Sequence, residues 1–180
     1  MNQILSCHLF DDAPGDSSRN TQELAEDGNA HAQFWLGFKL AWKGTASSFS
    51  QAGHWYRKAA EQGYALAQFN LGIMYSRGQG FERDRDLASF WITKAAERGD
   101  CGAQYRLGMN LNRLSLDNLP AAAMETRIEA FKWLLLAAAQ GYGDASAGCD
   151  LVAMGMTIES VKEARRRAEA FVCLEAPVVQ

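Results

Sequence analysis

Proline is scarce in this chain, with three residues among 180. Proline removes a backbone donor and constrains the residue before it, so its scarcity favours helix along the whole chain. Long hydrophobic runs are also missing, and no apolar segment approaches the roughly 20 residues of a membrane-spanning helix. We therefore expect a helical protein without a membrane partner.

Cysteine and histidine occur without the spacings that metal sites use. The cysteines form no CxxC pair and follow no regular interval, so neither a zinc site nor a disulfide framework is expected from Cys7, Cys101, Cys149 and Cys173. The histidines likewise have no partner at ligand spacing; they are His8, His31 and His54. We expect reduced thiols, as in a cytosolic protein, and neither a metal nor a cofactor.

A recognisable export signal is lacking too. Ile4-Leu5-Ser6-Cys7 looks like a lipoprotein cleavage site, but only six residues precede the cysteine, without a basic region or an apolar region of the usual length. We expect the protein to stay in the cytoplasm.

Neither sign of charge is in large excess, since 18 basic residues stand against 21 acidic ones and the formal net charge is −3. Nucleic acids attract clustered basic residues, so no nucleic acid partner is expected. The basic run at 165–167 stands beside Glu163 and Glu169, and we interpret it as a solvated helix face.

Familiar catalytic motifs are absent as well. The chain contains no Ser-x-x-Lys, Gly-x-Ser-x-Gly, Walker loop or His-Glu-x-x-His. Absence of a motif does not exclude catalysis, but no pattern in the chain supports it, and we expect no enzymatic activity.

What the chain does contain is repetition. A nine-residue stretch that begins with tryptophan and ends with glycine occurs at 55–63, 91–99 and 133–141. The residues between are helix formers, and glycine suits the left-handed position just past a helix end. Each copy therefore predicts the last two turns of a recurring helix.

A second element follows each glycine at a fixed offset. Ala-Gln-x-x-Leu-Gly occurs at 67–72 after Gly63 and at 103–108 after Gly99, and Ala-Gln-Phe-Trp-Leu-Gly at 32–37 follows Gly28. The steps between these glycines and Gly141 are 63 − 28 = 35, 99 − 63 = 36 and 141 − 99 = 42 residues. A period in this range predicts a solenoid, in which each unit is a helix A, a loop and a helix B.

The expected organisation is an N-terminal extension over 1–16, one solenoid over 17–172 and a tail over 173–180. Within the solenoid we place a half-repeat at 17–28, repeats at about 29–63, 64–99 and 100–141, and a terminal helix pair at 142–172. The extra length of the third repeat, around 115–120, is expected to form an elongated loop. Ser17 or Ser18, Asp84 and Thr157 are the expected helix caps, and the last helix is expected to reach about Val172.

The most complete unit carries a family resemblance. Ala-Gln-x-x-Leu-Gly-x-x-Tyr-x-x-Gly-x-Gly, then Asp, Ala and Trp, then Lys-Ala-Ala-Glu-x-Gly, runs from Ala67 to Gly99. The pattern resembles the Sel-one-like repeats (SLR), relatives of the tetratricopeptide repeat, over roughly residues 22–172. The resemblance implies an all-α, right-handed α-α superhelix of antiparallel helix pairs that acts as a protein-interaction scaffold, in a family widespread in bacteria. The first and third units depart from the pattern, with Leu40 and Leu111 in place of tyrosine.

The resemblance also implies where binding residues lie. Consensus residues stack, whereas the variable residues of each helix A line the concave groove. Spaced by four, three and four residues, and so on one helix face, the first unit's candidates are His31, Trp35, Phe38 and Trp42. Their equivalents are Leu66, Asn70, Ile73 and Arg77 in the second unit, and Gly102, Arg106, Met109 and Arg113 in the third.

This groove is expected to grade from aromatic to basic, which would suit a peptide with an apolar anchor and a carboxylate. Two alternatives stay open. Trp35 and Phe38 would serve packing alone if they lay beneath the N-terminal segment, whose apolar residues are Ile4, Leu5, Leu9 and Phe10. The arginines would be ordinary surface charge if they bound nothing.

We interpret the chain as a non-enzymatic scaffold or adaptor of the bacterial cytoplasm that binds a protein or peptide in this groove. A first alternative is a structural or assembly protein that self-associates, and the sequence leaves open a monomer or a weak dimer. A lesser alternative is a hydrolase, which would require a paired nucleophile and base in a pocket.

Overall fold

The computed structural model describes residues 20–117 and 120–172, and the regular structure within these ranges is entirely helical. Its helices are α1 (Thr21–Glu26), α2 (Ala30–Trp42), α3 (Ala46–Glu61), α4 (Ala65–Arg77), α5 (Arg85–Glu97), α6 (Cys101–Leu116), α7 (Pro120–Ala139), α8 (Ala145–Ala153) and α9 (Ile158–Glu169). The all-α class expected from the repeats is confirmed.

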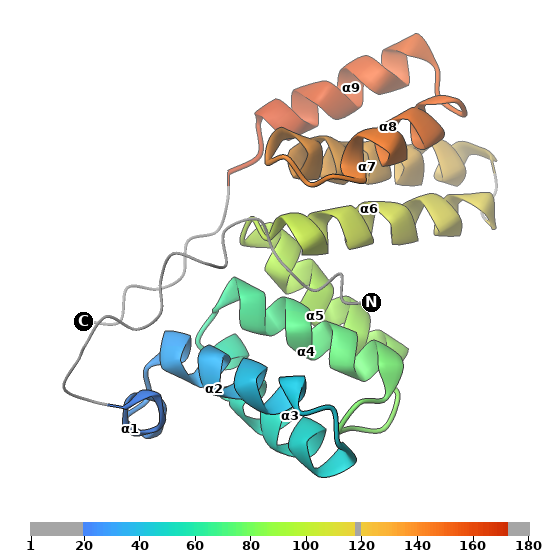
Figure 1. The fold of residues 1–180 in the computed structure, drawn as a ribbon. Coiled ribbons are helices and arrows are strands. Elements are labelled where there is room, and N and C mark those ends of the chain that lie inside the picture. Colours follow the sequence, from blue (N-terminus) through green and yellow to red (C-terminus); the bar gives the residue numbers. More distant parts are fainter. Residues whose placement is uncertain (1–19, 118–119, 173–180) are drawn as a thin grey trace.

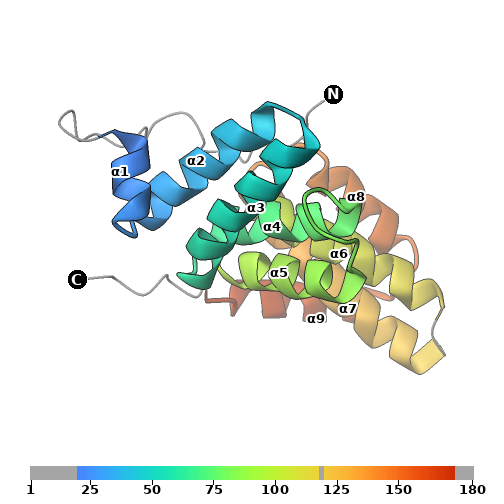
Figure 2. The ribbon, with the colours of Figure 1, turned by 90° about the horizontal axis from the view of Figure 1, so that it is seen from below.

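The helices stack in chain order as antiparallel pairs, from α1 at one end to α9 at the other (Figure 1). The pairs are α2 with α3, α4 with α5 and α6 with α7, and α3 contacts α4 as α5 contacts α6. Figure 1 looks onto α2, α4, α6 and α8, with α5 and α7 behind them, and Figure 2 gives the view from below. The fold is an α-α solenoid. The first helix of each pair lies on one side of it, and this side, made by α2, α4, α6 and α8, is called here the A-helix face.

The repeated glycines end the helices as predicted. Gly63 has φ +85° and Gly99 has φ +85°, in the left-handed region that costs glycine nothing. Beside them, the N–H of Gly63 donates to Ala60 and the N–H of Tyr64 donates to Ala59, so two of the last helical carbonyls are satisfied. The same pair of bonds recurs at Gly28, Gly99 and Gly141.

The glycine of each Leu-Gly pair lets the two helices of a unit approach closely. A Cβ added at Gly37, Gly72 or Gly108 would lie 3.2, 3.1 or 2.9 Å from a backbone carbonyl oxygen of the partner helix. Contacts this short force a neighbour to move, so a side chain at these positions would push the helices apart.

The recurring glutamine joins each unit to the one before it. The side-chain amides of Gln33, Gln68 and Gln104 donate to the carbonyls of Ala25, Ala60 and Ala96, each eight residues earlier, at 3.1, 2.9 and 3.2 Å. All three glutamines are buried. A buried amide needs hydrogen-bond partners, so this position requires a side chain that can donate to the alanine carbonyl.

The glutamine amide oxygens are not treated alike. Gln33 Oε1 accepts from Gln62 at 2.7 Å, and Gln104 Oε1 accepts from Gln140 at 2.8 Å. Gln68 Oε1 is buried with no hydrogen-bond partner. The second unit therefore carries an uncompensated acceptor that its neighbours do not.

The third unit corrects one expectation from the sequence. The elongated loop expected around 115–120 is wrong, because α6 continues to Leu116 and α7 already begins at Pro120. The added residues lengthen both helices, to 16 and 20 residues against 13 for α4 and for α5. Proline fits the first turn of a helix, where its missing N–H needs no partner, and Arg127 Nε donates to Ser115 Oγ across the extension at 3.2 Å.

The helix caps partly follow the sequence. Asp84 and Thr157 cap α5 and α9 as expected, accepting from backbone N–H groups of the first turn. Asn20 caps α1, in a reciprocal capping box with Glu23, whereas the expected caps Ser17 and Ser18 lie outside the described residues. The last helix ends at Glu169, earlier than expected.

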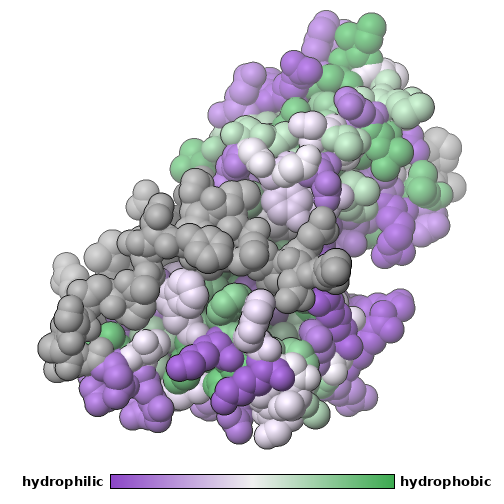
Figure 3. Space-filling model, in the orientation of Figure 1, coloured by the Kyte–Doolittle hydropathy of each residue, from purple (hydrophilic) through white to green (hydrophobic). Residues whose placement is uncertain are grey.

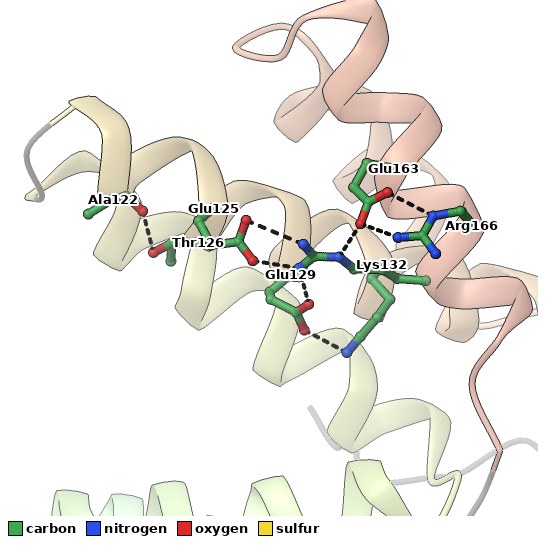
Figure 4. A network of polar contacts seen from close by, with 8 residues as sticks. Ala122, Glu125, Thr126, Glu129, Lys132, Glu163 and Arg166 are labelled. Carbon is green, nitrogen blue, oxygen red and sulfur yellow. Dashed lines mark hydrogen bonds and ion pairs between the residues drawn. The ribbon is translucent and has the colours of Figure 1, made fainter.

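An arginine network fixes α9 against α7 (Figure 4). Arg167, 28% exposed, donates to Glu125 at 2.6 Å, Glu129 at 2.7 Å and Glu163 at 2.8 Å. Hydrogen bonds from Arg166 and then Arg167 lower the pKa of Glu163 to about 2. Part of the basic run at 165–167 thus has a structural role that its sequence context did not indicate.

Asp100 caps α6 from a buried position. Its Oδ1 accepts from the N–H of Ala103 at 2.7 Å, and the residue is 6% exposed. Burial raises the pKa of Asp100 to about 6, although the N–H groups of Ala103 and Gly102 act in the opposite direction. The folded state therefore holds a proton that the unfolded chain releases near pH 4, so this group makes the free energy of unfolding fall as pH rises from about 4 to 6.

Candidate functional site

Four aromatic rings run along one side of α2. Neighbouring centroids are 6.1 Å apart from His31 to Trp35, 5.6 Å from Trp35 to Phe38 and 6.4 Å from Phe38 to Trp42. The indole N–H of Trp35 donates to His31 Nε2 at 2.8 Å, which orients both rings. The row ends at Trp42, whose surface is 72% exposed, an unusual state for so large an apolar side chain.

A cavity of about 480 Å³ lies between α2 and α4. Phe38, Trp42, Asn70, Ile73 and Arg77 line it, so the structure brings together candidates from the first and second units. Phe49 and Tyr56 of α3 and Met74 of α4 complete most of the wall. The volume falls in the usual range for ligand pockets, and the lining is largely apolar with a few polar groups, as such pockets are.

The polar side chains that line this cavity include Asn70, Tyr56, Arg77 and Gln79. Asn70 is 8% exposed and donates to the carbonyl of Leu66 at 2.7 Å. Tyr56 is 2% exposed, burial raises its pKa well above the usual range, and its hydroxyl makes no hydrogen bond within the described residues. Arg77 is exposed at the end of α4.

Arg106 continues the positive charge onto α6. It is half-buried, and its pKa is lowered first by burial and then by the charge of Arg77. Neither arginine forms an ion pair or side-chain hydrogen bond with any part of the chain that the structure describes. Two neighbouring like charges thus stand without a carboxylate on the A-helix face.

The other candidates lie apart from this cavity. Trp35 borders a second hollow of about 630 Å³ beside α1, shared with Phe38 and Trp42. Met109 packs against the cluster around Phe131 and Leu134. Arg113 is exposed further along α6.

Tyr56 and Phe49 were not anticipated, because they belong to helix B of the first unit. One signal was available for Tyr56. It follows the repeated tryptophan, where the later copies have Ile92 and Leu134, so the position varies within an otherwise repeated stretch. The N-terminal segment that would cover Trp35 and Phe38 in the alternative interpretation lies outside the described residues.

The cavity wall holds no acid, histidine, cysteine or serine among the residues that line it. Over 20–117 and 120–172, histidine, cysteine and carboxylate side chains form no group of three suited to a metal ion. The helices there are also too short or too polar to cross a bilayer.

The protein is thus a solenoid of helix pairs with a largely apolar cavity on its A-helix face. The chain belongs to the Sel1 repeat family, whose model matches residues 30–64, 65–100, 102–125 and 126–142. The last two matches together cover nearly all of α6 and all of α7, the lengthened third pair. Sel1 repeats typically mediate protein–protein interactions.

Known proteins show the same kinship. The chain is similar to a protective antigen of uropathogenic Escherichia coli, c5321, with a TM-score of 0.72 and 28% identity over 87% of this chain and 32% of that one. It also resembles a Sel1 repeat protein of Oxalobacter formigenes, with a TM-score of 0.62 and 29% identity over 83% of this chain and 63% of that one.

A curated relative matches a shorter segment. It is the ERAD-associated E3 ubiquitin-protein ligase component HRD3A of Arabidopsis thaliana, 40% identical over 65 residues. Those residues are 36% of this chain and 10% of the relative. The chain thus spans less than two thirds of each of these proteins.

Proposed function

We propose that this protein is a non-enzymatic scaffold or adaptor that binds a protein or peptide segment on its A-helix face. The observation that carries the proposal is the cavity between α2 and α4, where residues that vary between repeats converge. Residues repeated in every unit, in contrast, serve helix packing and the joints between units.

Interface physics supports this surface. Binding energy concentrates in tryptophan, tyrosine and arginine that line a desolvated pocket, and the face offers Trp42, Tyr56 and Arg77 around one cavity. Trp42 already contacts the ring of Phe38, and a tryptophan has only two side-chain torsions to fix on docking. The proposal includes a bacterial origin and a cytoplasmic location. The bacterial origin rests on the organisms of the two similar structures.

Photo-crosslinking in the host cell tests the proposal. A benzophenone amino acid is placed at Trp42 or Arg77 on the A-helix face, and in the control protein at Phe90, which is 49% exposed on α5 in the opposite layer. We expect a discrete protein adduct from positions 42 and 77 and none from position 90. Adducts that appear equally from all three positions, or only from position 90, would contradict binding on this face.

A second candidate function is self-association through the terminal pair. Leu151, Met154 and Ile158 are 53%, 88% and 76% exposed at the α8–α9 end, where Figure 3 shows hydrophobic residues gathered. Solenoids usually close such an end with a polar face. Sedimentation at increasing concentration tests this function, with Met154→Lys as the variant; a wild-type monomer throughout would eliminate it.

A further inference from the structure

The A-helix face carries an electrostatic imbalance at one place. Arg106 is half-buried and Arg77 stands close enough to affect its protonation, yet no carboxylate of the described chain pairs with either. This contrasts with Arg167 at the α7–α9 joint, which gathers three carboxylates. Partly buried positive charge without a counter-charge is unfavourable, and a bound anion would relieve it.

The cavity that Arg77 lines supplies the complementary half of a site. Its wall is apolar over Phe38, Ile73 and Met74 and contains no acidic residue. Tyr56 also lines the cavity and is 2% exposed. Its hydroxyl has no hydrogen-bond partner in the described chain. The hydroxyl is therefore available to donate to a carbonyl or carboxylate oxygen of a ligand in the cavity.

We infer that the occupant of this cavity is a peptide segment of a partner protein in which a bulky apolar side chain is adjacent to an aspartate or glutamate. The apolar side chain fills the space between Phe38 and Ile73, and the carboxylate lies between Arg77 and Arg106. The inference rests on the proposed function and narrows it to one class of ligand.

The geometry disfavours other occupants. A basic segment would meet two arginines and no acid, and juxtaposed like charges reduce affinity strongly. A purely apolar segment would fill the cavity but leave the arginines as they are. An apolar residue next to an acid satisfies both, through burial and through a charge-assisted fork of hydrogen bonds.

The test is a phage-display selection of random octapeptides on the immobilised full-length chain. Parallel selections use Arg77→Glu/Arg106→Glu and the control Arg85→Glu, which changes an exposed arginine of α5, in the layer opposite the A-helix face. Circular dichroism verifies the fold of each protein. We expect the wild type and the control to enrich peptides with an apolar residue beside an acid.

A selected peptide is then titrated against each protein. We expect the double charge reversal to weaken binding by about 100-fold or more, since each charge-assisted pair contributes roughly a factor of ten. Replacing the peptide's acid by its amide should weaken binding at least tenfold, and Tyr56→Phe should weaken it by roughly threefold to tenfold.

The outcomes separate the two levels of inference. If no peptide is enriched on the wild type, peptide binding itself fails. If peptides are enriched without an acid, or bind Arg77→Glu/Arg106→Glu equally well, the scaffold function stands and the ligand class is wrong.

A last variant addresses the chain's own N-terminal sequence, where Phe10 precedes Asp11. We expect Phe10→Ala/Asp11→Asn to leave affinity for the selected peptide within twofold. A tenfold gain would make this segment the occupant and overturn the assignment to a separate partner.

Discussion

Substitution of Gly108 by alanine tests the close approach of α6 and α7. The added Cβ would lie 2.7 Å from Leu134 Cγ, 2.9 Å from the carbonyl oxygen of Ala130 and 3.1 Å from Leu134 Cδ2. Leu134 is fully buried, and the carbonyl belongs to the backbone of α7, so neither neighbour can rotate away freely. We expect the longest helix pair to separate locally.

Two opposing effects set the magnitude. Alanine stabilises a helix interior by about 1 kcal/mol relative to glycine, whereas overpacking of a core costs about 1–3 kcal/mol and more where the backbone must move. Because a backbone carbonyl is involved, we expect overpacking to prevail and the free energy of unfolding to fall by about 1–2 kcal/mol.

Urea unfolding followed by circular dichroism measures the change, and hydrogen exchange shows whether it is local to α6 and α7, since repeat arrays need not unfold in one step. Gly143→Ala is the matched control, because a Cβ there meets nothing within 4 Å and the backbone φ is not positive. We expect that control to be neutral or slightly stabilising. A Gly108→Ala protein as stable as the wild type would refute the packing argument.

Three further predictions concern polar side chains that form hydrogen bonds between or within helices. Asp100→Asn keeps a capping oxygen but cannot ionise, so unfolding experiments from pH 4 to 7.5 should show it gaining up to roughly 3 kcal/mol on the wild type as pH rises; parallel curves would exclude the raised pKa. Arg167→Met should lower stability by about 1–2 kcal/mol and loosen α9 in hydrogen exchange, with a smaller effect in 1 M salt, whereas Arg166→Met should have a much smaller effect on stability; equal effects would contradict the network. Gln104→Met should cost more in thermal unfolding than Gln68→Met, by about 1 kcal/mol, because only Gln104 has a partner for its amide oxygen; the reverse order would be inconsistent with the hydrogen bonds described.

The sequence predicted the repeat architecture well because its signals are local. The glycine eight residues after each tryptophan ends a helix, and the glutamine at a fixed offset donates one hydrogen bond to a backbone carbonyl. The loop at 115–120 was mispredicted for the opposite reason: six added residues with few helix breakers extend two helices, and only their mutual packing makes that length stable.

The candidate site was predictable to the extent that one helix face determined it. Spacings of three and four residues placed Phe38 and Trp42, and separately Ile73 and Arg77, on common faces that the structure brings around one cavity. Variation between the repeats singled out position 56, but its place in the cavity wall could not be predicted, because that depends on how α3 packs against α2 and α4. Met109 was likewise assigned by periodicity, while its packing depends on the position of α8.

The glutamine joints make the chain divisible. Each joint spans eight residues across a unit boundary and uses the same donor and the same alanine carbonyl. Excision of residues 64–99 would bring Gln104 to the position that Gln68 now holds relative to Ala60, with a glycine and a cap already in register. A gene with such joints can therefore gain or lose whole units by recombination and keep the same hydrogen bond at each new boundary. The length of the binding face can then change independently of the residues that line it.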